Sequence, residues 1–201
     1  MTLLVRDEAD IVEDTICFHL NNGVDFIVAT DNGSVDKTPE ILEKYRRLGH
    51  LSFTEVTEHN YQQSIWVSRM AQRAAAEFGA THMFHCDADE FWMPQNGNLK
   101  DNLPEEDQVL WVPRINYLPS PNPDPNRKIL DQFEYLVVNP LESYTNFEDF
   151  KTRVSTHQML LYDLAPKVFT SSNHSRVGPG NHTVLTEEPV TNTLTDAILI
   201  K

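Results

Sequence analysis

The sequence predicts an α/β protein with a mostly parallel central sheet flanked by helices. In the first half of the chain, short apolar runs alternate with helical patterns, and each helical pattern stops at a glycine. Strands that alternate with helices form βαβ units with right-handed crossovers. Ligands of such sheets bind beyond the carboxyl ends of the strands, so a site is expected in the segments that follow the strands.

The elements of the first half follow from this pattern. The predicted strands are 2–5, 26–29, 51–56 and 82–86. The predicted helices are 11–22, 40–48 and 62–78. Gly23, Gly49 and Gly79 end these helices, while Thr38 as N-cap and Pro39 as the first helical residue begin the second one.

The second half is less regular. After a predicted strand at 109–112, the Pro- and Asn-rich segment 118–128 is expected to form a loop that determines specificity. Strand-like runs at 134–138 and 159–162 lie among polar loops. With 201 residues, of which 40% are hydrophobic, the chain can fold as one well-buried domain.

The charge and cysteine content restrict the class of protein. The formal net charge of −14 disfavours binding to nucleic acid, and a phosphorylated ligand would need a divalent cation or placed basic groups. Cys17 and Cys86 form neither a disulfide framework nor a zinc-type spacing, which fits a reducing cytoplasm. No apolar stretch approaches the ~20 residues of a membrane span, and nothing resembles a signal peptide. We therefore expect a cytoplasmic chain without a membrane span.

Two carboxylates follow the fourth predicted strand. Asp87 and Asp89 stand one residue apart where the apolar run meets solvent. Hard oxygen ligands of this kind suit Mg²⁺ or Mn²⁺, which keep open positions for phosphate oxygens. Asp is also common in turns and caps, so a purely structural role is the alternative.

Charged and polar residues also follow the first two predicted strands. Arg6 and Glu8 follow the first, while Asp31, Ser34 and Asp36 follow the second, just before a helix N-terminus that favours an anionic phosphate. A plain turn with an N-cap is the alternative for the second loop. Three such loops on one predicted edge of the sheet favour a binding site.

These residues resemble the motifs of glycosyltransferase family 2, in the bacterial branch with an Arg-x-Glu-Ala start and a DADEF signature. The resemblance is carried by LLVRDEADIV, DNGSVDKT and HCDADEFW, and it covers roughly residues 1–92. It implies a GT-A fold and a nucleotide-diphosphate sugar as the donor. The Gln-x-x-Arg-Trp motif of processive polysaccharide synthases is absent from the sequence, so long-chain polymerisation is not expected.

The resemblance also implies roles for single residues. Asp31 contacts the nucleobase of the donor, Asp87 contacts ribose or metal, and Asp89 holds the Mn²⁺ or Mg²⁺ that bridges the diphosphate. Asn32 stands where many relatives carry a second Asp, which leaves the identity of the base open. The remaining candidates for the nucleotide-sugar site are Arg6, Glu8, Ser34, Asp36, Arg69 and Lys167.

A base must deprotonate the acceptor hydroxyl. The resemblance favours Glu148 and Asp149 in NFEDFKTR, because family members usually supply a carboxylate from a later Glu-Asp pair. Asp131 and Glu134 are rivals. Surface solvation is the alternative for all four.

Several further positions each allow a functional and a structural interpretation. His182 in GPGNHT is the expected third metal ligand, or an ordinary loop histidine. Lys167 meets the diphosphate, or is an exposed lysine. Trp92 stacks against an acceptor, or packs in the core. Arg69 shares a helix face with Arg73, and solvent exposure is the alternative for both.

The favoured function is a metal-dependent glycosyltransferase that moves a sugar to an acceptor hydroxyl of a saccharide or other compound, with inversion expected from the family. Residues 1–107 would form the nucleotide-sugar-binding half and residues 108–201 the acceptor-side half of a single GT-A-type domain. The apolar ending AILIK leaves open that the chain is a fragment. The alternatives are a catalytically silent sugar-nucleotide-binding domain and a sugar-nucleotidyltransferase, although LLVRDEAD lacks the glycines of the latter.

Overall fold

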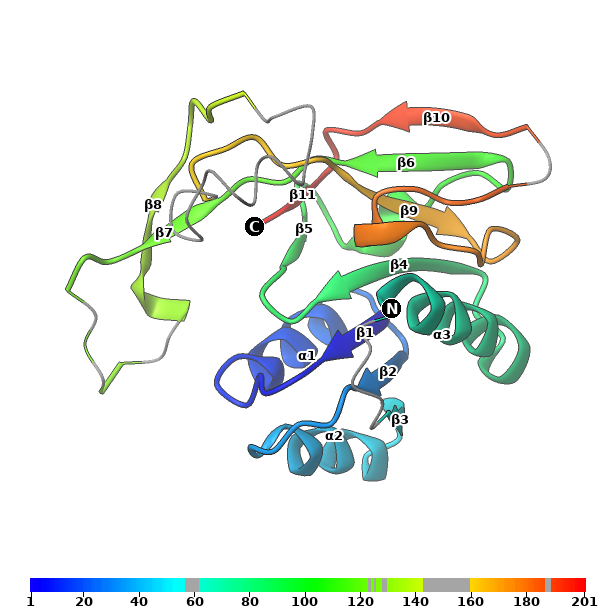
Figure 1. The fold of residues 1–201 in the computed structure, drawn as a ribbon. Helices are drawn as coiled ribbons and strands as arrows, with labels where there is room; N and C mark the ends of the chain where they lie inside the picture. The colour runs from blue at the N-terminus through cyan, green and yellow to red at the C-terminus, as the bar shows by residue number, and fades with distance from the viewer. Residues whose placement is uncertain (57–61, 123, 125, 128–129, 143–159, 187–188) are drawn as a thin grey trace.

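The computed structural model describes residues 1–56, 62–122, 124, 126–127, 130–142, 160–186 and 189–201. It confirms the predicted α/β class, with a mostly parallel central sheet between helices (Figure 1). Within the described residues, no helix is both long enough and apolar enough to cross a bilayer.

The central sheet has seven strands in the order β10-β6-β9-β4-β1-β2-β3. Their bounds are β1 (Thr2–Val5), β2 (Ile27–Asp31), β3 (Leu51–Glu55), β4 (His82–Asp87), β6 (Gln108–Val112), β9 (Lys167–Ser171) and β10 (Thr191–Leu194). Neighbours pair in parallel except β9, which lies antiparallel between β4 and β6. The sheet therefore draws strands from both halves of the chain.

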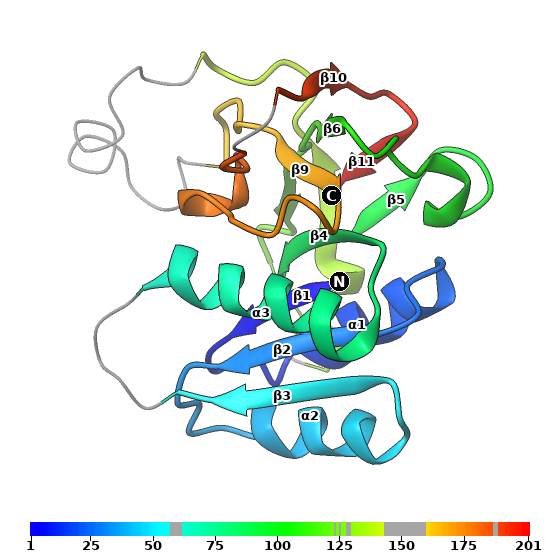
Figure 2. The same ribbon diagram turned by 90° about the vertical axis from the view of Figure 1, so that its right-hand side faces the viewer.

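The helices cover both faces of the parallel part of the sheet (Figure 2). They are α1 (Val12–Asn21), α2 (Thr38–Arg47) and α3 (Gln63–Phe78). Alternate residues of a strand point to opposite faces, so Ile27 and Ala29 pack with the core under α1 and α2. Val28 packs with the core under α3. The near-continuous apolar strands of the sequence reflect this burial on both faces.

Two small sheets complete the fold. β5 (Trp92–Pro94) pairs with β11 (Ile198–Ile200), and β7 (Tyr117–Pro119) pairs with β8 (Phe133–Leu136), both antiparallel. Three short 3₁₀ helices are η1 (Leu99–Asn102), η2 (Leu130–Gln132) and η3 (Pro179–Asn181). In Figure 1 the β7–β8 ribbon lies on the side of the molecule toward which β1 and β4 point.

Three local predictions need correction, and two strands were not predicted. α2 begins at Thr38, one residue before the predicted first residue Pro39, so Thr38 is not the N-cap. The Thr38 hydroxyl instead accepts a hydrogen bond from the Glu8 amide (2.8 Å). The predicted loop 118–128 begins inside β7. The run 159–162 forms only an isolated bridge, from Tyr162 to Leu141, within its described part. β9 and β10 were not predicted, because a lysine opens the first and polar residues dominate the second.

Candidate nucleotide-sugar site at the carboxyl ends of the strands

The structure brings the loops after β1, β2 and β4 together around a cavity of about 250 Å³. Its lining residues are Leu4, Val5, Arg6, Glu8, Asn32, Asp87, Ala88 and Asp89. The three strands run parallel and adjacent, so their carboxyl ends meet at one edge of the sheet. α1 and α2 start from the same edge and direct their N-terminal backbone amides toward it.

Two polar residues of α1 fix the turn that carries Asp87 and Asp89. The buried Thr15 hydroxyl donates to the Ala88 carbonyl. The buried His19 ring donates from Nδ1 to the Thr15 carbonyl (2.8 Å) and accepts at Nε2 from the Trp92 amide (3.2 Å). This pattern requires a neutral ring, and burial lowers the pKa of His19 to about 4. The turn is thus held at both ends before any ligand binds.

A buried ion-pair network lies behind this turn. The Lys167 ammonium, 1% exposed, donates to Asp87 Oδ2 and to Glu90 Oε2, both at 2.6 Å. Arg114 Nη1 lies 3.5 Å from Glu90 Oε1. Burial opposes the charge of Lys167, yet Glu90 and Asp87 together raise its pKa, so the ammonium stays charged. Lys167 therefore fixes Asp87 Oδ2, while Asp87 Oδ1 faces Asn181.

Asp89 differs from Asp87 in its surroundings. Its side chain is exposed, lines the cavity, and makes no side-chain hydrogen bond or ion pair with the described part of the chain. Asp87 Oδ1 has only a long contact with Asn181 Nδ2, at 3.5 Å. Asn181 is buried, at positive φ (62°), and its Oδ1 has no hydrogen-bond partner among the described residues. The Asp89 carboxylate is thus available to a ligand of the cavity, whereas Asn181 is buried and does not line it.

The predicted metal set is only partly assembled. Asp87 and Asp89 line one cavity, but no three His, Cys, Asp or Glu side chains of the described residues converge as metal ligands. His182 Nδ1 donates to the Pro166 carbonyl (2.9 Å), and burial lowers its pKa. Mg²⁺ commonly binds through one or two carboxylates plus substrate phosphates, so the donor chemistry of Asp87 and Asp89 fits such an ion.

The loops after β1 and β2 are joined by hydrogen bonds. Asp31 is buried, and its Oδ1 accepts from the amide (3.1 Å) and the hydroxyl (2.5 Å) of Ser34. The Ser34 hydroxyl also accepts from the Asp7 amide (2.9 Å). Asp36 accepts from the Ala9 amide (2.9 Å) and the Thr38 amide (2.9 Å). Asp31, Ser34 and Asp36 thus all hold backbone in place at this edge.

Glu8 carries the strongest sign of crowded negative charge in the cavity. Burial, followed by the nearby carboxylates of Asp89, Asp10, Asp36 and Asp87, raises its pKa to about 7. A cation in the cavity would relieve this repulsion. Arg6 also lines the cavity and is exposed, 3.8 Å from Asp7.

Three other residues considered in the sequence analysis do not line this cavity. Arg69 is exposed on α3, and Arg73 bonds to Glu77 and to the β3 hydroxyls of Thr54 and Ser52. Trp92 is fully buried in the core, which excludes stacking on an acceptor in this structure.

The candidate bases have different outcomes. Glu148 and Asp149 lie outside the described residues. Glu134 pairs with Arg127 at 3.5 Å. Asp131 lines a separate cavity of about 550 Å³, which also includes Asp89.

Lys167 is a clear correction. Its alternative reading as an exposed lysine is wrong, because it is buried in β9 between two carboxylates. Its partners Glu90 and Arg114, together with Asn181, are residues that sequence reasoning missed. A usable signal was present at Glu90, since a carboxylate between Ala88 and the apolar Phe91 needs a cationic partner if it is buried.

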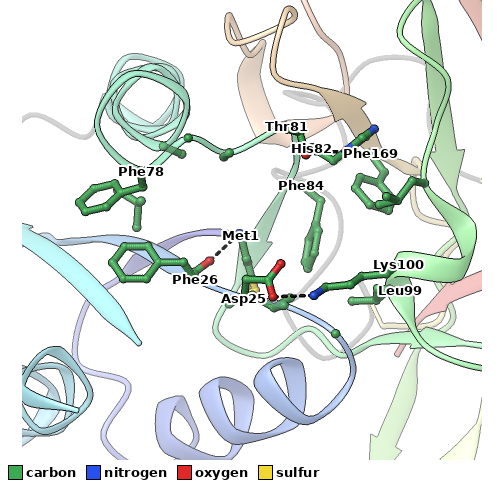
Figure 3. Close-up of a pocket in the computed structure, with 17 residues that line it drawn as sticks. Met1, Asp25, Phe26, Phe78, Thr81, His82, Phe84, Leu99, Lys100 and Phe169 are labelled. Carbon is green, nitrogen blue, oxygen red and sulfur yellow. Dashed lines mark hydrogen bonds and ion pairs between the residues drawn. The ribbon is translucent and has the colours of Figure 1, made fainter. Parts of the chain in front are cut away.

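A further cavity, of about 360 Å³, lies at the opposite, amino end of the strands (Figure 3). Phe26 and Phe78 stack there with ring centroids 4.5 Å apart. Lys100 Nζ and Asp25 Oδ1 form an ion pair at 2.5 Å beside it.

Comparison with known proteins gives limited likenesses. No family model matches the sequence, and no curated protein matches it. Among solved structures, 96% of this chain aligns with 59% of S. aureus TarS 1-349 at 14% identity and a TM-score of 0.44. In the complex of TarS 1-349 with UDP-GlcNAc, 96% of this chain aligns with 57% of that chain, at 14% identity and a TM-score of 0.46. With a longer TarS chain, 56% of this chain aligns with 21% of that chain, at 20% identity and a TM-score of 0.41.

The chain therefore spans less than two thirds of the length of the TarS chains that it resembles. These likenesses are too weak to carry a functional conclusion. We base the proposed function on the geometry of the site and on the sequence motifs.

Proposed function

We propose that this chain is the nucleotide-sugar-binding core of a metal-dependent glycosyltransferase of the GT-A type. The observation that carries the proposal is the cavity where Glu8, Asn32, Asp87 and Asp89 meet at the carboxyl ends of three parallel strands. The mostly parallel sheet is the architecture that the family resemblance implies, and this edge is where such sheets bind ligands.

The site has the elements needed to hold a diphosphate in an acidic protein. Asp87 and Asp89 would hold Mn²⁺ or Mg²⁺. When bound, the ion stabilises negative charge that develops on the leaving nucleoside diphosphate. Arg6 and the N-terminal amides of α1 and α2 add positive potential at the same edge.

Two sets of contacts preorganise this edge. Lys167 holds Asp87 through a buried ion pair, and Thr15 holds the peptide between Asp87 and Asp89. A ligating side chain fixed before binding loses less conformational entropy when the ligand arrives. Asp31 remains the candidate for the base contact from the family resemblance; its buried carboxylate is fixed by Ser34 at the same edge and is not among the residues that line the cavity.

The acceptor must lose a proton during transfer. Glu148 and Asp149 remain the candidates from the family resemblance, and Asp131 is the described rival, on the far side of Asp89. Transfer of a sugar with inversion needs a single base of this kind opposite the leaving group.

Calorimetric titration of UDP, GDP and dTDP, with and without Mn²⁺, tests the proposal. We expect one diphosphate to bind only with metal, and Asp89→Asn to abolish that binding. The matched control is Asp25→Asn, an exposed carboxylate at the opposite end of the sheet, which should bind as the wild type does. Absence of metal-dependent binding to all three diphosphates would contradict the proposal. Binding without slow hydrolysis of the matching UDP-, GDP- or dTDP-sugar would favour a catalytically silent domain.

A further inference from the structure

The cavity of about 550 Å³ beside Asp89 is within the size range of small-molecule sites. Asp89 lines both this cavity and the smaller one that we assign to the donor, so the two spaces are neighbours across one side chain. A group bound in the larger cavity would therefore lie next to the reacting sugar. This inference rests on the proposed function for its relation to the donor.

Aromatic side chains form a substantial part of the apolar wall of this cavity, together with Ile11, Met93, Ile115 and Leu160. Phe18 of α1, Phe91, Tyr117 of β7 and Phe133 of β8 line it, and each side chain is only half-buried. Phe91 is fixed by an edge-on contact with Phe18, with ring centroids 5.2 Å apart. Rings that are fixed in place yet half-exposed offer apolar surface to a ligand at low entropic cost.

The polar groups of the cavity decide what kind of ligand it takes. The charged lining residues within the described part of the chain are Asp14, Asp89, Asp131 and Lys201. Asp89 is a metal ligand in the proposed donor site, so the carboxylates that act on this cavity alone are Asp14 and Asp131. They outnumber the one ammonium and disfavour an anionic ligand. Lys201 Nζ also lies over the Tyr117 ring, 5.5 Å from its centroid. This cation–π contact reduces the attraction of the ammonium for an anionic ligand.

We propose that this cavity binds a neutral saccharide as the acceptor. The C–H faces of a pyranose ring match the aromatic side chains, and its hydroxyls match the carboxylates and Asn116 Oδ1, since Asn116 Nδ2 already donates to the Leu160 and Tyr162 carbonyls. The excess of carboxylates over the one ammonium disfavours an acceptor that carries phosphate groups. Asp131 lies in the same cavity and therefore within the space where an acceptor hydroxyl would be deprotonated.

Saturation-transfer NMR on the full chain without donor tests the proposal directly. The probes are methyl β-glucopyranoside, its N-acetylglucosamine counterpart, and glucose 6-phosphate as the matched anion. We expect the neutral glycosides to bind and the phosphate not to bind. Tyr117→Ala and Phe133→Ala should each weaken glycoside binding roughly tenfold, since each removes a large apolar contact. Tyr135→Ala, on the same strand as Phe133 but 53% exposed and outside the cavity, is the control.

The outcomes separate this proposal from the donor site. No binding of either glycoside, equal binding in Tyr117→Ala and Phe133→Ala, or equal binding of glucose 6-phosphate would each overturn the saccharide cavity. Glycoside binding that follows the expected variants, in a chain that binds no nucleotide, would support the cavity and contradict the proposed donor site alone.

Discussion

The two ends of the central sheet carry cavities of opposite character. The amino-end cavity is the larger, about 360 Å³ against about 250 Å³, and Phe26, Phe78, Phe84 and Phe169 contribute to its lining (Figure 3). The carboxyl-end cavity is lined by charged and amide side chains from three loops. The chemical character of the lining side chains, more than the volume, distinguishes these two cavities.

The difference follows from the direction of the strands. At the carboxyl end, the loops after β1 and β2 lead into helix N-termini, where backbone amides attract negative charge. At the amino end, α3 ends at Phe78, the chain returns to β4 at His82, and Phe78 stacks on Phe26 beside the cavity. The amino end accordingly contributes packing, and the carboxyl end contributes charge.

Breaking the buried ion pair at the carboxyl end has the largest expected effect. Lys167→Met leaves Glu90 and Asp87 without their ammonium partner, which should cost roughly 3–5 kcal/mol of unfolding free energy. Lys100→Met, which removes the exposed pair with Asp25 at the amino end, should cost less than about 1 kcal/mol. Denaturant titration of both variants measures the contrast. Similar losses for the two would mean that the Lys167 network is not buried as described.

Removal of the hydroxyl that holds the carboxylate turn should have an intermediate effect. Thr15→Val leaves the buried Ala88 carbonyl without its donor and should cost about 1–3 kcal/mol. It should also weaken Mn²⁺-dependent nucleotide binding, because Asp87 and Asp89 flank Ala88. Stability and calorimetric affinity would be measured on the same preparation. An unchanged affinity with lowered stability would show that the turn is held by other contacts.

A change in the aromatic pair at the amino end should affect stability alone. Phe26→Leu removes the stacking with Phe78 and should cost about 1 kcal/mol, the worth of an aromatic pair. Nucleotide affinity should equal that of the wild type. If nucleotide affinity fell by more than the loss of stability can explain, the ligand would have to bind at the amino end of the sheet, which would contradict the proposed site.

The smallest expected effect is a pH-dependent one at Glu8. Its pKa, about 7 in the folded state, lies above the ordinary value of 4.5, so ionisation of Glu8 disfavours the fold. This loss of stability begins as the pH rises above 4.5 and is complete above 7. Glu8→Gln should therefore melt at a higher temperature than the wild type at pH 8, with a smaller difference at pH 5.5. Glu105→Gln, on an exposed loop, is the control; a pH-independent gain from Glu8→Gln would contradict the charge crowding.

The first half of the fold could be predicted because its signals are local. Apolar runs, the Gly23, Gly49 and Gly79 stops, and the alternation of strand and helix identify β1 to β4 and α1 to α3 to within about two residues. The placement of the three charged loops on one edge followed from the rules for parallel sheets.

The rest depends on contacts between residues that are far apart in the chain. β9 is an interior strand of the sheet, but its first residue is a lysine. Lys167 can be buried because it pairs with Asp87 and Glu90, and these partners lie 80 and 77 residues away in the sequence. Thr15 and His19 look like ordinary polar positions of an amphipathic helix, and only the folded structure shows that they hold the 87–92 turn. A single sequence can indicate that a buried charge such as Glu90 needs a partner, but it does not identify a partner that lies so far along the chain.

The central claim is that metal and nucleotide bind at the carboxyl end of the sheet. Mn²⁺ broadens the NMR signals of nearby nuclei, so backbone spectra recorded with UDP, GDP or dTDP and substoichiometric Mn²⁺ locate the ion directly. We predict broadening of the amides of Ala9, Asn32 and Ala88, with those of Gly79 and Thr81 at the amino end unaffected. Broadening around Gly79 and Thr81, or no localised broadening with any of the three nucleotides, would contradict the account.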